Sequence, residues 1–277
     1  MSYSFQTNVT SLVAENNLST TSDFQSRTIT RLTSGYRINS SADDAGGLAV
    51  ANKFRSDVAE LTQGVRNAND GLSQLQIIDG GLNNISQILD SLKSLATQSA
   101  STTFTGSRTT LDTQFQTLLG EINRQAANVG LASAGGTGAT YNTDISVYIG
   151  GGDNQTDAQV QINLSGYNVD SLGLGINTDK VDTTAHALTA ITDIENAVAT
   201  LGKTQGIVGD GENDLNFAIN LANSQITNYS AADSRIRDAD VATEAANLTK
   251  AQVLQQSSVA ALSQANSAPQ ALLKLFQ

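Results

Sequence analysis

Apolar residues recur at alternating steps of three and four positions along much of this 277-residue chain. The first such stretch covers 61–96, where Asp79 and Ser86 occupy two apolar slots while Ile78 and Ile85 continue the pattern on the adjacent stripe. A heptad spacing sustained over this length is typical of a helix packed along a seam, and not of a short globular helix. We therefore expect a long rod-like helix here.

Two further stretches show the same spacing, over 111–129 and over 187–236. At a rise of ~1.5 Å per residue, the longer of the two would extend roughly 75 Å. Four glycines lie inside it: Gly202, Gly206, Gly209 and Gly211. Because each glycine costs up to about 1 kcal/mol relative to alanine in a helix interior, we expect a weak point or a short break there.

Between the second and third stretches the period of the pattern falls to two. Apolar and polar residues alternate over 145–149 and again over 160–164, and the glycine-rich GGDN at 151–154 separates the two runs. This arrangement predicts a β-hairpin near 143–165 with one apolar face. An isolated hairpin is marginally stable in water, so we expect it to lie on the helices.

The two ends of the chain carry an irregular amphipathic pattern over 5–33 and 241–276, diluted by Ser, Thr and Asn. Neither segment has a core of its own, and an isolated helix of this kind is marginal in water because its stability comes from packing. We therefore expect the two ends to complete one another, or a neighbouring copy's ends. This is the strongest indication from the residues alone that the chain is an assembly subunit.

Composition narrows the classes of function. The chain has 15 basic and 26 acidic residues, a formal charge of −11, which argues against nucleic acid or an anionic membrane surface as the main partner. It has no cysteine, hence no disulfide framework, and its single proline agrees with long helices. No apolar run approaches the roughly 18 residues of a membrane span, and residues 1–20 show no signal-peptide pattern.

Candidate catalytic and ligand-binding residues are few. His186 has no second histidine nearby, and the adjacent Asp43 and Asp44 are better explained as caps at a helix start than as an acid–base pair. The DGENDLN segment at 210–216 lacks the central glycine and distant glutamate of a calcium loop, and LGLG at 172–175 is not a nucleotide-binding pattern. We expect no catalytic residue, no metal site and no cofactor.

Three segments resemble bacterial flagellins. RLTSGYRINSSADDAGGLAVANKFRSDV at 31–58 is similar to the N-terminal signature of that family and continues in QGVRNANDGLSQLQIIDGGLNNISQILDSLKSLATQSA at 63–100. AADSRIRDADVATEAANLTKAQVLQQSSVAALSQANSAPQALLKLF at 231–276 resembles the matching C-terminal signature. The intervening helical stretches and hairpin fit the same family.

The resemblance implies a mainly α fold of long antiparallel helical rods with one β-hairpin. Residues 1–41 and 241–277 would pair as a terminal coiled-coil domain, which is called D0 in flagellins. Residues 42–240 would form the rod domain, D1, with no outer domain. In flagellins the termini line the central channel of the filament and are disordered in the free monomer. That agrees with the incomplete helices at both ends.

The implied function is that of a structural subunit, not an enzyme, which polymerises into the flagellar filament for swimming motility. Copies that stack by non-closing contacts generate a helical polymer. The resemblance implies an extracellular filament and, as partners, further copies of the chain, an export chaperone, the type III export apparatus, and hook-junction and cap proteins. It implies no nucleic acid and no membrane.

Two groups of contact residues follow from the resemblance. Apolar side chains of both termini would bury in the inner tube of the filament: Leu12, Val13, Leu18, Phe24, Leu248, Leu254, Val259, Leu262, Leu272 and Phe276. Charged residues would make spoke and inter-rod contacts: Arg31, Arg37, Asp43, Asp44, Arg235, Arg237, Asp238 and Asp240. The alternative for the charged group is that these side chains are solvated or make contacts within one chain only.

The sequence departs from the family pattern at two places. A vertebrate innate receptor reads an Arg and a Leu on the first rod of many flagellins and a Glu on the second, and the equivalent positions here are Ser91, Leu95 and Gln114. Because Arg is a typical interface anchor, we expect weak receptor activation. The second departure is VGDGENDLNFAIN at 208–220, where flagellins usually carry a basic sequence.

Two other functions remain open on the sequence. A flagellar hook–filament junction protein shares the terminal sequence character but does not form long filaments. A secreted adhesin-like or glycan-binding rod would need a ligand site within 135–182, a short segment rich in Ser and Gly.

Overall fold

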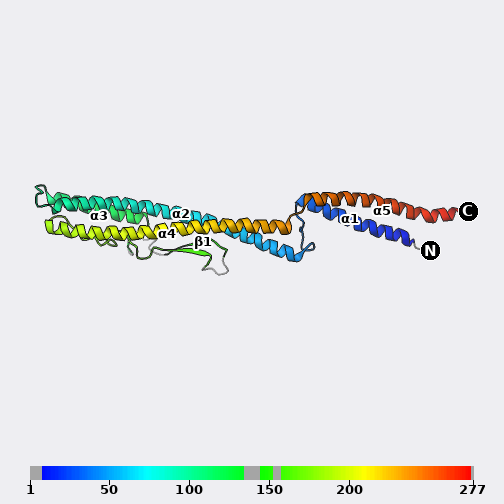
Figure 1. Ribbon diagram of the computed structural model, residues 1–277, viewed down its shortest axis with the longest axis horizontal. Helices are drawn as coiled ribbons and strands as arrows, with labels where there is room; N and C mark the ends of the chain where they lie inside the picture. The colour runs from blue at the N-terminus through cyan, green and yellow to red at the C-terminus, as the bar shows by residue number, and fades with distance from the viewer. Residues whose placement is uncertain (1–7, 134–143, 152–156, 276–277) are drawn as a thin grey trace. The chain divides into compact units, whose positions relative to one another are not determined.

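The computed structural model describes residues 8–133, 144–151 and 157–275, with the backbone alone described for 268–275. Its elements follow one another as α1 (Val9–Ser34), α2 (Ala45–Ala100), α3 (Arg108–Asn128), β1 (Asp144–Tyr148), β2 (Gln159–Asn163), α4 (Thr184–Arg237) and α5 (Val241–Leu275), as Figure 1 shows. The predicted fold class, long helices with one β-hairpin, is confirmed. The chain forms two compact units: a terminal unit, Met1–Ser56 with Asn228–Gln277, and a central unit, Asp57–Thr227.

Each helix starts at a polar side chain that accepts a hydrogen bond from a backbone N–H of the first turn, which offsets the unpaired donors of a helix N-terminus. The five capping residues are Asn8, Asp44, Ser107, Thr183 and Asp240. Asp44 accepts from the N–H of Gly47 at 2.8 Å, which confirms the capping role that the sequence indicates for it. The starts of the helices are thus set by local sequence.

In the central unit, α2 and α4 are antiparallel. Lys93 pairs with Glu195 at 3.0 Å, and Gln205 donates to Asn83 at 3.3 Å, so positions rise along α4 as they fall along α2. The heptad predicted for α2 is confirmed, because its apolar positions are buried: Leu61, Ala68, Leu75, Ile78, Leu82, Ile85, Leu89, Leu92 and Ala96. Phe115 and Ile122 of α3 are also fully buried.

The helix α4 is continuous from Thr184 to Arg237, so of the two expectations at its glycines, a weak point or a short break, the break is wrong. Gly202, Gly206 and Gly209 have open space beside them, whereas Gly211 lies against Ile162 of the hairpin. Helices in proteins draw most of their stability from packing, and Leu201, which is 1 % exposed, anchors this segment in the core. Packing therefore offsets the low helix propensity of the four glycines.

The buried stripe of α4 also differs from the predicted one. Val198, expected on the apolar seam, is 40 % exposed, and small residues occupy the inner face instead. The buried positions of this helix are Ala187, Ala190, Ile194, Ala197, Leu201, Thr204, Val208, Gly211, Leu215 and Ala222. Small side chains on this face allow the neighbouring backbone to approach closely, which an analysis that scores only large apolar residues overlooks.

The hairpin packs on the long helices, as predicted. Its strands are antiparallel, with Val147 paired to Val160 and Ile145 paired to Ile162. The backbone carbonyl of Ile149 lies where a Cβ on Gly64 of α2 would sit. Most of the predicted turn at 151–154 lies outside the described residues.

Asp179 is buried in the segment that precedes α4. This residue is 9 % exposed, and its carboxylate Oδ2 atom has no hydrogen-bond partner in the described structure. Burial, together with the nearby charge of Asp193, raises the pKa of the Asp179 carboxyl to about 6 from an ordinary value of 3.8. The folded chain therefore holds a proton at this position more tightly than the unfolded chain does.

In the terminal unit, α1 and α5 pair in antiparallel fashion. Asn8 donates to the carbonyl of Ala265 at 2.9 Å near one end of the pair, and Arg31 donates to Glu244 at 3.3 Å near the other. Small residues are buried along this interface, among them Ala251, which is fully buried. In the same unit, the rings of Phe54 on α2 and Tyr229 on α4 stack with centroids 5.5 Å apart.

Replacing a glycine of α2 by alanine should change the unfolding free energy in opposite directions at Gly64, which is closely packed, and at Gly80, which has open space beside it. Gly64→Ala would push a methyl group into the Ile149 carbonyl, and overpacking of this kind lowers the unfolding free energy by roughly 1–3 kcal/mol. Gly80→Ala meets open space and should raise that free energy by up to about 1 kcal/mol. Urea unfolding followed by circular dichroism measures both; equal effects at the two sites would contradict the packing described.

The raised pKa of Asp179 predicts a pH-dependent stability. The folded state binds more protons than the unfolded state between the unfolded pKa of 3.8 and the folded pKa of about 6, so stability falls as pH rises through that window. Asp179→Asn should therefore raise the melting temperature at pH 7.5 by more than it does at pH 4. Asp90→Asn, which removes an exposed carboxylate from the same unit, is the control; an equal effect of Asp179→Asn at both pH values would contradict the assignment.

Candidate assembly surfaces

The linkers at the inner ends of α1 and α5 are joined by backbone hydrogen bonds. Gly35 ends α1 with a φ of 75°, a left-handed conformation that glycine adopts without strain. Its carbonyl accepts from the N–H of Ala239 at 2.9 Å, and the N–H of Arg37 donates to the carbonyl of Arg237 at 2.6 Å. Tyr36 and Asp238 form an isolated antiparallel bridge between these bonds. The two linkers are thus fixed to each other.

Arg31 joins three segments of the terminal unit. Its guanidinium lies 3.3 Å from the carboxylate of Glu244 on α5 and 3.9 Å from that of Asp43 in the α1–α2 linker. The backbone N–H groups of Ser40 and then Asn39 hold the pKa of Asp43 below its ordinary value, so this carboxyl is ionised at neutral pH. Glu244 is only 7 % exposed, and a buried carboxylate needs such a partner.

Other predicted spoke residues also make contacts within the chain. The guanidinium of Arg237 lies 4.2 Å from the centre of the Tyr36 ring, and Arg37 donates to the carbonyl of Ile236 at 2.6 Å. Asp238 accepts from Ser234 at 2.6 Å. Asp240 caps α5, and hydrogen bonds from the Thr243 hydroxyl and from the N–H groups of Thr243 and Ala242 lower its pKa. Arg235 is exposed in the last turn of α4.

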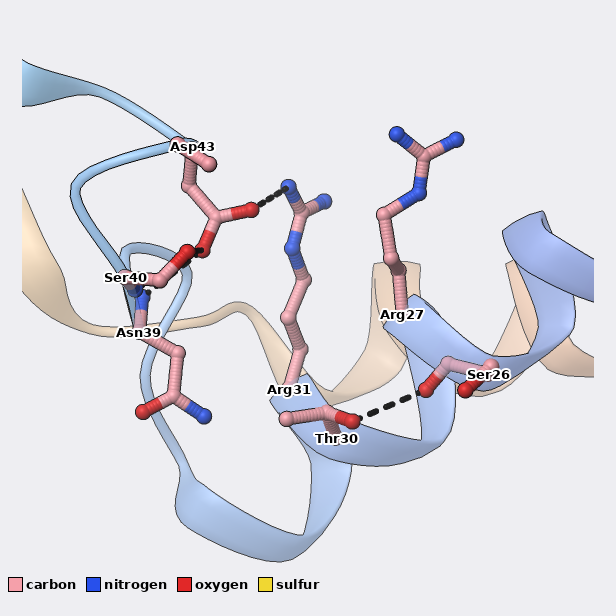
Figure 2. Close-up of a pocket in the computed structure, with 8 residues that line it drawn as sticks. Ser26, Arg27, Thr30, Arg31, Asn39, Ser40 and Asp43 are labelled. Carbon is pink, nitrogen blue, oxygen red and sulfur yellow. Dashed lines mark hydrogen bonds and ion pairs between the residues drawn. The ribbon is translucent and has the colours of Figure 1, made fainter.

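A polar pocket opens beside Arg31, with a cavity of about 360 Å³. Its walls come from α1 and from the α1–α2 linker: Ser26, Arg27, Thr30, Arg31, Asn39, Ser40, Ala42 and Asp43. Figure 2 shows the side chains of Arg27 and Arg31 rising from the same side of α1, with Asp43 facing Arg31. The pocket is lined by hydrogen-bonding groups and has no described metal-ligand cluster.

The pairing of α1 with α5 leaves apolar side chains in water. Leu12 is 61 % exposed and Val13 is 55 % exposed, and with Glu15, Asn16 and Ser19 they line a shallow cavity of about 350 Å³. Leu254 and Val259 of α5 are exposed as well, whereas the remaining described members of the predicted inner-tube group are half-buried: Leu18, Phe24, Leu248 and Leu262. The side chain of Leu272, and all of Phe276, lie outside the described residues.

The central unit also exposes apolar side chains on α4. Phe217 is 71 % exposed and Leu221, one helical turn later, is 61 % exposed. Leu221 also lines a cavity of about 80 Å³ beside Val160 of the hairpin. The three receptor-equivalent residues lie on other helices, with Ser91 and Gln114 exposed and Leu95 half-buried.

Some features were not anticipated from sequence. Glu244, the partner of Arg31, is one acidic residue among many in a helical pattern, and Tyr36 is a single aromatic residue in a short linker. Phe217 could have been found, because it falls outside the 3-4 pattern of its own helix. Arg27 gives no signal of its own in the sequence, since a lone basic residue on a helix is usually solvated.

The single histidine of the chain is exposed. His186 pairs with Asp182 at 2.5 Å on an exposed helix start, and this contact lowers the pKa of Asp182. Within the described ranges, three or more potential metal ligands do not come together anywhere. None of the described helices combines the length and the hydropathy that a membrane-spanning segment requires.

Comparisons with family models and with known relatives all point to one family. Residues 5–130 match the model of the bacterial flagellin N-terminal helical region, and residues 191–276 match that of the C-terminal helical region. The chain is 30 % identical to "Flagellin FlaB1" of Treponema pallidum over 285 residues, and 32 % identical to a flagellin of Xenorhabdus nematophila over 316 residues. Each alignment covers 98 % of this chain and 98 % of the relative.

Among solved structures, the chain is similar to the crystal structure of Bacillus cereus flagellin, with 25 % identity and a TM-score of 0.48. That similarity covers 61 % of this chain and 94 % of the other. The family assignment does not depend on it, because the two terminal regions and the full-length relatives carry it. The chain belongs to the bacterial flagellin family and is a structural subunit of the flagellar filament.

Proposed function

We propose that further copies of this chain cover the exposed apolar faces of α1 and α5 as the filament forms. The observation that carries the proposal is the exposure of Leu12, Val13, Leu254 and Val259 on a helix pair that has little core of its own. Burying an aliphatic side chain of this size contributes roughly 1.5–3 kcal/mol. Repeated in every subunit, that gain favours polymer over monomer.

The exposure of apolar side chains on the terminal helices also supports different roles for the ends and the middle of the chain. Residues 1–41 with 241–277 would act as the inner D0 domain, and 42–240 as the D1 rod. The spoke residues, Arg31 with its partners Asp43 and Glu244 above all, would hold the linkers in one geometry. Helices whose apolar faces are satisfied only in the polymer would be marginal in the free monomer, which limits premature assembly.

The remaining partners follow from the flagellin family, whose filaments lie outside the cell. A subunit with exposed apolar terminal helices needs a chaperone before export, and the type III export apparatus would carry it out. At the filament it would meet hook-junction proteins at one end and a cap at the other. The proposed role in the filament is structural and needs no enzymatic step.

The polymer proposal predicts that polar substitutions on the exposed faces weaken assembly without unfolding the monomer. Leu12→Asn should raise the critical concentration for elongation of filament seeds by roughly tenfold or more, because about 1.4 kcal/mol corresponds to a factor of ten. Ser22→Asn, at an exposed polar position of the same helix, should leave it unchanged. Sedimentation and electron microscopy measure both.

If Leu12→Asn assembled as readily as the unaltered chain, the proposed burial of α1 would be wrong. Unaltered monomers that never elongate seeds would be a more serious contradiction. They would favour the alternative of a hook–filament junction protein.

We further propose that the innate receptor responds weakly to this chain. Ser91 replaces the arginine of the recognised surface and Gln114 replaces its glutamate, so an interface anchor and its charge are missing. The double variant Ser91→Arg, Gln114→Glu should raise potency in a receptor reporter-cell assay by about tenfold or more, because both positions are exposed. Full potency of the unaltered chain would contradict this proposal.

A further inference from the structure

Arg27 is the one basic group in the polar pocket of α1 that has no partner among the described residues. Its side chain is exposed on α1, one turn before Arg31, and makes no hydrogen bond or ion pair there. In Figure 2 its side chain rises from the same side of α1 as that of Arg31, and Arg31 stands between it and the linker residues Ser40 and Asp43. Arg27 thus lines the pocket without contributing to its internal contacts.

The other charges of the pocket are already paired. Arg31 lies between Asp43 and Glu244, and Asp43 also accepts from the N–H groups of Asn39 and Ser40, both within 3.1 Å, and from the Ser40 hydroxyl. These contacts within the chain neutralise each other and hold the α1–α2 linker against α1. Arg27 is left as an uncompensated positive charge on the pocket wall.

The Arg27 guanidinium suits an incoming acceptor. The side-chain amide of Asn39, on the linker wall of the pocket, points away from Arg27 in Figure 2, with Arg31 between them. A guanidinium recognises a carboxylate through two parallel N–H bonds, so Arg27 can hold one without a further donor. An open cavity of about 360 Å³ has room for an acidic side chain.

Charge complementarity identifies the occupant. The chain carries 26 acidic residues against 15 basic ones, so another copy of it presents mainly carboxylates. In the terminal unit, Glu15 and Asp23 are exposed on α1 and make no hydrogen bond or ion pair with another described residue. We propose that the Arg27 pocket receives an α1 carboxylate, Glu15 or Asp23, of a second copy of this chain in the filament. The inference deepens the proposed self-assembly and rests on it.

A substitution series on the full chain separates this contact from general charge effects. Arg27→Gln should raise the critical concentration for seeded elongation about threefold to tenfold at low salt, because it removes an interfacial charge pair. Salt screens a contact of this kind, so the deficit should shrink as ionic strength rises. Arg55→Gln removes an equal charge from an exposed site of the same unit outside the pocket, and should change elongation little.

Mixing two variants tests whether the contact crosses between copies. Arg27→Glu monomers and monomers carrying Glu15→Lys with Asp23→Lys should each elongate poorly alone and well when mixed, because each then supplies the charge that the other lacks. Circular dichroism of each monomer checks that both remain folded. Restoration in the mixture cannot come from a pair within one chain.

The outcomes are distinct. If Arg27→Gln behaves like Arg55→Gln, or if the mixture elongates no better than its components, the pocket does not receive that carboxylate and the inference fails. Unaltered chains would still elongate seeds in that case, so the filament function would stand. If unaltered chains themselves fail to elongate, the proposed self-assembly fails first.

Discussion

Two paired helices can bury only one stripe of each other, and every other apolar side chain on them stays in water until something else covers it. The α1–α5 pair illustrates this limit, because small residues such as Ala251 fill the shared stripe while Leu12 and Val259 remain outside it. The pair is aligned by polar contacts at its two ends, at Asn8 and at Arg31. Its geometry is thus defined in one chain, whereas its apolar burial is not.

The central unit buries most of its large apolar side chains within one chain, although Phe217 and Leu221 of α4 stay exposed. Here α2, α3 and α4 each bury a stripe of apolar side chains, and the hairpin approaches α2 at Gly64 and α4 through Ile162 against Gly211. Glycine and alanine at these positions lower helix propensity but allow close packing, which contributes more. The central unit therefore has a core of its own, whereas the terminal unit leaves apolar side chains exposed that we propose further copies cover.

Much of this organisation could be predicted from sequence because it depends on periodicity and on local caps. The heptad from Leu61 to Ala96, the hairpin and the cap at Asp44 all follow from patterns a few residues long. The uninterrupted α4 and its inner stripe of small residues could not be predicted, since they depend on which surface faces the hairpin. Arg31 was a candidate from sequence, but its pairing with Glu244 brings together residues far apart in the chain. Long-range pairs of this kind leave no periodic signal.

The burial of the terminal helices by neighbouring copies is the central claim, and the absence of cysteine from the chain allows a direct measurement. A single Val259→Cys variant places one thiol on the exposed face of α5, at a position that is 52 % exposed. Its rate of reaction with a maleimide is measured in the monomer and in the assembled filament. The account predicts rapid labelling of the monomer and labelling at least about tenfold slower in the filament, because packing excludes the reagent from a close-packed interface. Equal rates in the two states would show that this face stays in water, and the account would be wrong.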